Sequence, residues 1–88
     1  MSMSEIRTHE HRLLVKLIKD YRLDIGLRQV DLADALGVPQ SMISKLEVGE
    51  RRIDVLELRK ICNALGISML DFISRFEKEL DRNNEADR

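Results

Sequence analysis

Apolar residues recur every three or four positions along most of the chain, which is the spacing of helices that bury one face. The first such stripe lies before Gly26 and predicts a helix that begins near Thr8, a residue able to cap it. Its expected buried residues are Leu13, Leu14, Leu17, Ile18, Tyr21 and Ile25. Later in the chain, Asp54 with Glu57 forms a capping-box pattern, and Ser68 is a second cap, so two more helices are predicted to start there. Their expected apolar stripes are Val55, Leu58, Ile61, Cys62 and Leu65, and then Met69, Leu70, Phe72, Ile73, Phe76 and Leu80.

Between these helices, residues 29–47 show two short helical patterns that meet at Gly37. Ala33 falls where two crossing helices come closest, so a small side chain is needed there. Gly37 falls in the turn, where glycine adopts a left-handed backbone at little cost. Ile43 and Leu46 are three residues apart and bury one face of the second helix. This is the spacing of a DNA-reading helix-turn-helix. Its helices are expected from about Gln29 to Leu36 and from near Pro39 to Gly49.

From Arg22 to Phe72 the chain resembles the phage repressor and Cro-type helix-turn-helix proteins, also called the XRE family. The matching residues are Gly26-Leu27, Gln29, Leu32-Ala33, Leu36-Gly37-Val38, Gln40-Ser41, Ile43-Ser44, Leu46-Glu47, Gly49 and Ala64-Leu65-Gly66. The resemblance implies an all-α, compact five-helix domain of the lambda-repressor type, which binds DNA, usually as a dimer, and usually regulates transcription. The long apolar stripe after Ser68 adds an extended C-terminal helix to this fold.

The resemblance also implies roles for individual residues. Arg22 would pair with Glu47 and fix the second helix of the motif against the first helix of the domain. Gln29 would hydrogen-bond a DNA phosphate at a helix N-terminus, where free backbone N–H groups also favour anions. Arg51 and Arg52, in the loop after Gly49, would contact phosphates as well. Two positions depart from the family pattern, which prefers Ser or Thr at both. Arg28 loses a cap but adds a cation beside the DNA, and Pro39 suits a first helical turn.

The expected base-reading surface is the outer face of the second motif helix. With Ile43 and Leu46 inward, a step of about 100° per residue turns Ser41, Ser44 and Lys45 outward. Gln40 lies in the first turn, and Met42 lies on the flank, where its side chain could touch a thymine methyl group. The alternative interpretation is an ordinary solvated face. The surrounding helix-turn-helix pattern favours base reading.

Composition and charge limit the other classes of function. The net charge is −1, and residues 53–88 carry the acidic excess, so one monomer is expected to bind DNA weakly. The single cysteine, Cys62, excludes an internal disulfide, fits a core position and suits a reducing cytoplasm. No apolar run reaches membrane-spanning length, and no signal-peptide pattern is present. His9 and His11 lie on different helical faces, so no metal site is expected. No catalytic constellation and no cofactor motif is present, so an enzyme is not expected.

The C-terminal stripe extends past the core that the family fold needs. Ile73, Phe76 and Leu80 are therefore predicted to form a dimer contact with the same stripe of a second copy. The alternative is that this helix folds back over its own domain. The expected organisation is a flexible lead over residues 1–7, one domain over residues 8–80 and a polar tail over residues 81–88.

Together these features predict a homodimeric transcriptional regulator, a repressor rather than an activator, acting on a near-palindromic operator in double-stranded DNA at the nucleoid. Small members of the family include restriction–modification controllers, phage or plasmid repressors and antitoxins, and the sequence does not choose among them. No ligand sensor is evident. The alternative function is an antitoxin-like interaction module that binds and masks a partner protein.

Overall fold

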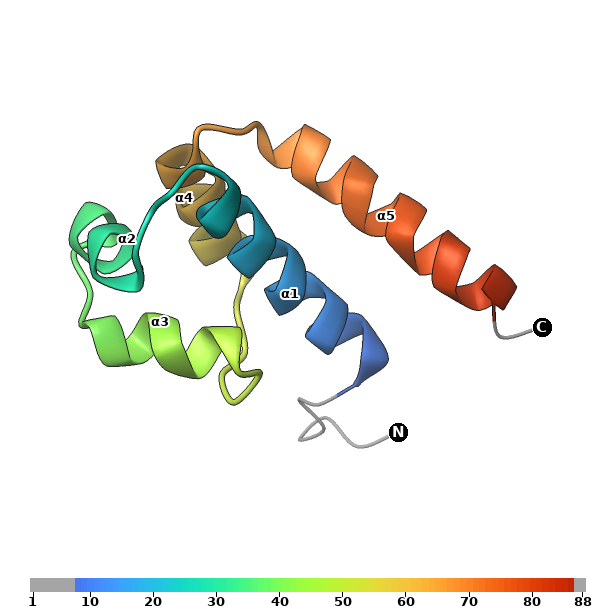
Figure 1. Cartoon of the computed structure of the whole chain (residues 1–88), viewed down its shortest axis with the longest axis horizontal. Helices are drawn as coiled ribbons and strands as arrows, with labels where there is room; N and C mark the ends of the chain where they lie inside the picture. The colour runs from blue at the N-terminus through green and yellow to red at the C-terminus, as the bar shows by residue number, and fades with distance from the viewer. Residues whose placement is uncertain (1–7, 87–88) are drawn as a thin grey trace.

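A computed structural model describes residues 8–86, with side chains described to Arg82, and folds them into five helices (Figure 1). The helices are α1 (His9–Asp24), α2 (Gln29–Leu36), α3 (Gln40–Glu47), α4 (Val55–Leu65) and α5 (Met69–Ala86). Every regular element in this part of the chain is a helix, so the all-α prediction is confirmed. The lead over residues 1–7 and the last two residues lie outside the described part.

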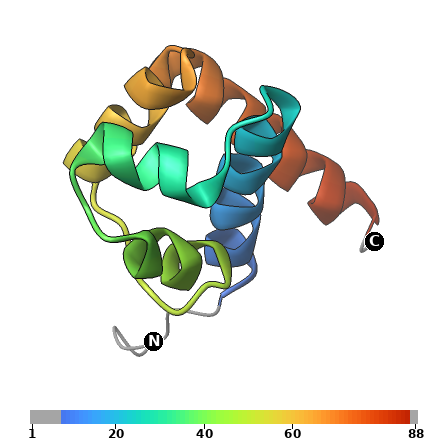
Figure 2. The ribbon, with the colours of Figure 1, turned by 60° about the vertical axis from the view of Figure 1, so that its left-hand side comes forward.

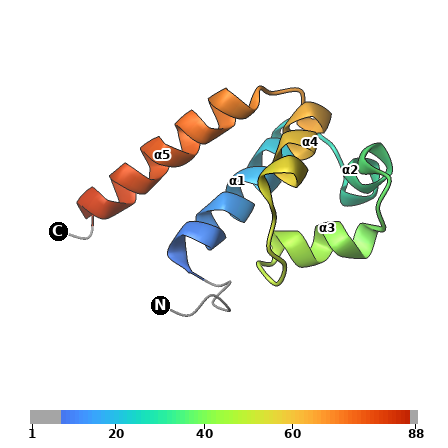
Figure 3. The same ribbon diagram turned by 180° about the vertical axis from the view of Figure 1, so that it is seen from behind.

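Helix α1 lies at the centre of the arrangement and contacts α3, α4 and α5 (Figure 1). Helices α2 and α3 cross on one side of it, as Figure 2 shows most clearly. Helix α5 runs back beside α1 on the opposite side, which both Figure 1 and the rear view in Figure 3 show. The helix-turn-helix therefore occupies one end of the molecule and α5 the other.

The core is made almost entirely of aliphatic side chains from all five helices. Its largest fully buried members are Phe72, Leu17, Ile18, Leu32, Ile43, Leu46 and Cys62. Three residues predicted to be buried are instead exposed: Ile25 by 54%, Val55 by 63% and Leu70 by 79%. Ile25 follows the last residue of α1 and Val55 is the first residue of α4, so each lies at a helix end. Leu70 precedes Phe72 by two positions, and two helical steps place these side chains on opposite sides of α5.

The helix boundaries follow from local capping chemistry. The Thr8 hydroxyl accepts a hydrogen bond from the His11 N–H at 3.1 Å, and the Ser68 hydroxyl accepts one from the Asp71 N–H at 3.0 Å. Asp54 and Glu57 form the predicted capping box at 2.8 and 3.0 Å. Helix α5 continues to Ala86, so it runs beyond the expected end at residue 80 and takes in most of the predicted tail.

Helix α5 packs along α1 through aromatic and aliphatic contacts. The Phe72 and Tyr21 rings lie 5.7 Å apart, and the Arg75 guanidinium lies 5.0 Å from the centre of the Tyr21 ring. Further along α5, the partly buried side chains that pack against the core are Ile73, Phe76 and Leu80. The helix thus folds back over its own domain and still leaves part of its apolar stripe uncovered. None of the helices in residues 8–86 has the length and apolar character needed to span a membrane.

Candidate nucleic-acid interface

The turn between α2 and α3 sets the geometry of the candidate interface. Gly37 has a φ of 69°, a left-handed conformation that closes α2, and the next N–H, on Val38, bonds to the Ala33 carbonyl at 3.0 Å. Ala33 is fully buried, so the two helices cross closely at this point. With Ile43 and Leu46 also buried, α3 is fixed with one face inward and the opposite face in solvent.

A buried ion pair holds α3 against α1. The Arg22 Nε donates to Glu47 Oε2 at 2.7 Å, and a second guanidinium nitrogen donates to Oε1 at 2.9 Å. The side chains are only 6% and 1% exposed, and the remaining guanidinium nitrogen donates to the Leu27 carbonyl at 2.7 Å. Arg22 and Glu47 therefore form the two-point pair that the resemblance implies. Such a fork fixes both distance and orientation between the helices.

Gln29 extends this pair into a network that joins three helices. Its side-chain amide donates to Glu47 Oε1 at 3.0 Å, and the Gln40 amide donates to the Gln29 carbonyl oxygen at 3.5 Å. The resemblance implies a DNA phosphate as the partner of Gln29. In this structure its amide group bridges the start of α2 to both ends of α3, which orients the N-terminus of α2 beside the exposed face of α3.

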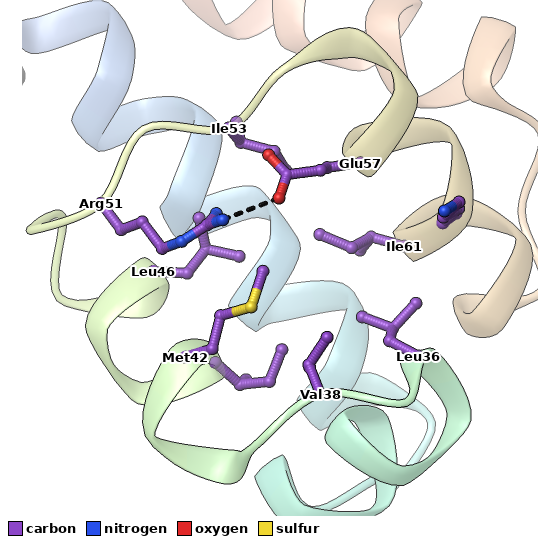
Figure 4. A pocket seen from close by; sticks show the side chains of 10 residues that line it. Leu36, Val38, Met42, Leu46, Arg51, Ile53, Glu57 and Ile61 are labelled. Carbon is purple, nitrogen blue, oxygen red and sulfur yellow. Dashed lines mark hydrogen bonds and ion pairs between the residues drawn. The ribbon is translucent and has the colours of Figure 1, made fainter.

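The exposed face of α3 contains most of the predicted base-reading residues. Gln40, Ser41 and Lys45 are exposed and Ser44 is half-buried. Met42 differs from them, because its side chain lies on the α4 side of the helix, in the wall of a pocket (Figure 4). This placement does not favour the predicted contact between Met42 and a thymine methyl group.

The pocket has a volume of about 110 Å³ and lies between α2, α3 and α4 (Figure 4). Its floor is apolar, and at its mouth Arg51 donates to Glu57 at 2.8 Å and to the Arg52 carbonyl at 3.0 Å. The Arg51 guanidinium lowers the pKa of the Glu57 carboxyl below its usual value. Arg51, a predicted phosphate contact, is thus held toward α4, whereas Arg52 is exposed on the same loop.

Arg28 also has an acidic partner. Its guanidinium pairs with Asp31 at 2.8 Å, and the Asp31 carboxylate accepts the Arg28 N–H at 3.0 Å. These bonds lower the pKa of Asp31 to about 2. The Asp31 carboxylate therefore satisfies the Arg28 N–H, one of the free N–H groups at the start of α2. The spacing of three residues between Arg28 and Asp31 is a signal from which their bond could have been predicted.

No three His, Cys, Asp or Glu side chains come together to suit a metal ion within residues 8–86. His9 is exposed, and His11 lies partly buried beside the Arg51–Arg52 loop, where burial and the Arg52 charge lower its pKa.

Helices α2 and α3 cross, α3 has an exposed polar face, and the N-terminus of α2 lies beside that face. This arrangement defines a helix-turn-helix DNA-binding domain. The chain belongs to the XRE-type helix-turn-helix family, since the family model described as "Helix-turn-helix" matches residues 18–72, more than half of its length. It is accordingly a DNA-binding transcriptional regulator.

Solved structures give the same assignment. The wild-type restriction–modification controller protein C.Esp1396I is 27% identical, with a TM-score of 0.78 over 84% of this chain and 95% of that one. The same controller, solved as a tetramer in complex with its natural 35 base-pair operator, gives 27% identity and a TM-score of 0.77 over 83% and 96% of the two chains. The clp gene regulator ClgR from C. glutamicum is also 27% identical, with a TM-score of 0.73 over 81% and 91%. No curated protein sequence matches the chain.

Proposed function

We propose that the protein binds a near-palindromic DNA operator as a homodimer and represses transcription from it. The observation that carries this proposal is the exposed polar face of α3, which the network of Arg22, Glu47 and Gln29 holds in a fixed orientation. A reading helix must be rigid, because base contacts require hydrogen-bonding groups at defined positions. Binding to DNA would place the protein at the nucleoid in the cytoplasm, and the role requires no catalytic step.

The proposed contacts divide into base reading and phosphate binding. Gln40, Ser41, Ser44 and Lys45 would face base edges in the major groove. Around them, the phosphate contacts would come from the N-terminus of α2, beside Arg28 and Gln29, and from the loop that holds Arg51 and Arg52. Arg52 is exposed on that loop, and Arg51 would have to leave Glu57 to reach a phosphate.

The proposed dimer contact is the part of the α5 stripe that α1 does not cover. Ile73, Phe76 and Leu80 pack against the core and remain partly exposed, so a second copy of α5 could bury the rest. The controller C.Esp1396I assembles as a tetramer on its operator, which supports an oligomeric mode of binding here. Two joined reading heads also compensate for the weak attraction of a chain with a net charge of −1.

Selection of bound duplexes from random DNA, followed by gel shifts with the enriched sequence, tests operator binding. We expect a near-palindrome with half-sites about 34 Å apart, one turn of DNA. If the selection enriches no sequence, the proposal is contradicted. Co-purification of a second protein would then favour the antitoxin-like module.

Sedimentation at micromolar concentration tests the dimer contact. We expect the Leu80→Glu variant to be monomeric, because the added charge would lie in the contact. Lys78→Glu is the control, since Lys78 is exposed and, two helical steps before Leu80, lies on the opposite side of α5. A fully dimeric Leu80→Glu variant, or a monomeric wild type, would exclude this contact. Thermal unfolding of each variant checks that the domain stays folded.

A further inference from the structure

Three cations line one edge of α1, outside the helix-turn-helix. Arg12, Lys16 and Lys19 are spaced four and three residues apart, and all three are exposed. Helical geometry places them on one side of α1, next to the buried side chains of Val15 and Arg22 that face α3. The three cations are therefore beside the reading helix and not on the side that α5 covers.

This edge of α1 and the C-terminal end of α3 form one continuous surface. A shallow hollow of about 290 Å³ separates the two helices, and its lining residues are Arg12, Val15, Lys16, Lys19, Glu47, Val48 and Gly49. Val48 is exposed on the same side of α3 as Ser44, one helical turn further on. The basic edge of α1 thus adjoins the polar reading face without an intervening element.

The charge in this hollow is positive. Glu47 is its only acidic lining residue, and that carboxylate is buried and already paired with Arg22. Lys16 pairs with Asp20 at 2.7 Å, at the edge of the stripe away from α3. Glu50 is exposed and borders an adjoining hollow with Arg12. Glu47 is neutralised by Arg22, so three cations outnumber the two remaining carboxylates, Asp20 and Glu50. The hollow therefore has a positive charge that attracts a polyanion.

We propose that Arg12, Lys16 and Lys19 bind the phosphate backbone of the DNA that flanks the half-site. This inference rests on the proposed function and adds a contact surface outside the helix-turn-helix. Arg12 and Lys19 are seven residues apart, about 10 Å along the helix. Phosphates of one strand advance about 3.4 Å along the duplex axis per step, so this edge spans about three of them. The positive edge also explains how a chain with a net charge of −1 presents a cationic surface to DNA.

The test compares two triple variants of equal charge change. One carries Arg12→Gln, Lys16→Gln and Lys19→Gln. The matched control carries Arg59→Gln, Lys60→Gln and Lys78→Gln, three exposed cations of α4 and α5. Affinity for the selected operator is measured by fluorescence anisotropy over a range of salt concentrations.

We expect the slope of log affinity against log salt to be less steep in the α1 variant, by about 0.9 for each phosphate that the variant no longer neutralises. The ranking of operator sequences should stay unchanged. Trimming the base pairs that flank the half-sites should make the wild-type slope less steep in the same way. The slope of the α1 variant should not change. The control should keep the wild-type slope.

An α1 variant with the wild-type slope, or a control whose slope falls equally, would overturn this inference and leave the proposed function standing. A wild type that binds no selected duplex would overturn the proposed function itself.

Discussion

Replacing Glu47 with leucine would leave the Arg22 guanidinium buried between α1 and α3 without a carboxylate. Two charge-assisted bonds of 2.7 and 2.9 Å would be broken, and only the 2.7 Å bond to the Leu27 carbonyl would remain. Breaking a buried pair in this way costs about 3–5 kcal/mol. At about 0.05–0.15 kcal/mol per residue, a domain of 88 residues is stable by roughly 4–13 kcal/mol. The single change should therefore lower Tm by more than about 12 °C and could unfold the chain.

The double variant separates the pair from its surroundings. Changing Arg22 to methionine and Glu47 to leucine together removes both charges, and replacing a buried pair by apolar side chains is often neutral. We expect the double variant to cost several kcal/mol less than the sum of the two single variants in urea unfolding.

The exposed pair of Lys16 and Asp20, also 2.7 Å apart, is the matched control and should couple by less than about 1 kcal/mol. If the buried pair couples no more strongly than this surface pair, the assigned role of Arg22 and Glu47 is wrong.

The reading face, the partly buried His11 and the turn each give a further prediction. Changing Ser41, Ser44 or Lys45 to alanine should alter the ranking of operator variants in gel shifts, at about 1–3 kcal/mol per base contact, and an unchanged ranking would contradict the reading face. Burial and the nearby Arg52 charge lower the pKa of His11, so the unfolded chain binds this proton more readily and stability should fall as pH drops below 6.5. His11→Gln should reduce that decrease in urea unfolding at about pH 5; equal decreases in both proteins would refute it. Gly37→Ala should cost about 1–2 kcal/mol of stability, because the φ of 69° disfavours any Cβ although nothing lies within 4 Å of it, and an unchanged midpoint of unfolding would speak against this.

Local chemistry in the sequence determined the helices and the motif. The caps at Thr8, Asp54 and Ser68 act on N–H groups within three residues of themselves, so the sequence alone predicts where those helices begin. The helix crossing requires a small side chain at Ala33, and the turn requires a left-handed backbone at Gly37, so both residue types also mark the motif in the sequence. The register of α3 followed from these positions, and so did the exposure of Ser41 and Lys45.

Tertiary packing decided which charged and polar groups have partners. Arg51 bonds to Glu57 across the α3–α4 loop, and the Gln29 amide bonds to Glu47, although the positions of both in the motif predict contacts with DNA. A helical period gives the direction of a side chain but not the neighbour that it meets. The sequence predicts Met42 on the flank of the reading face, and the structure shows that this flank lines the pocket next to α4. The basic edge of α1 likewise became a surface next to α3 only when the chain folded, because its position depends on the crossing of two helices that lie far apart in the sequence.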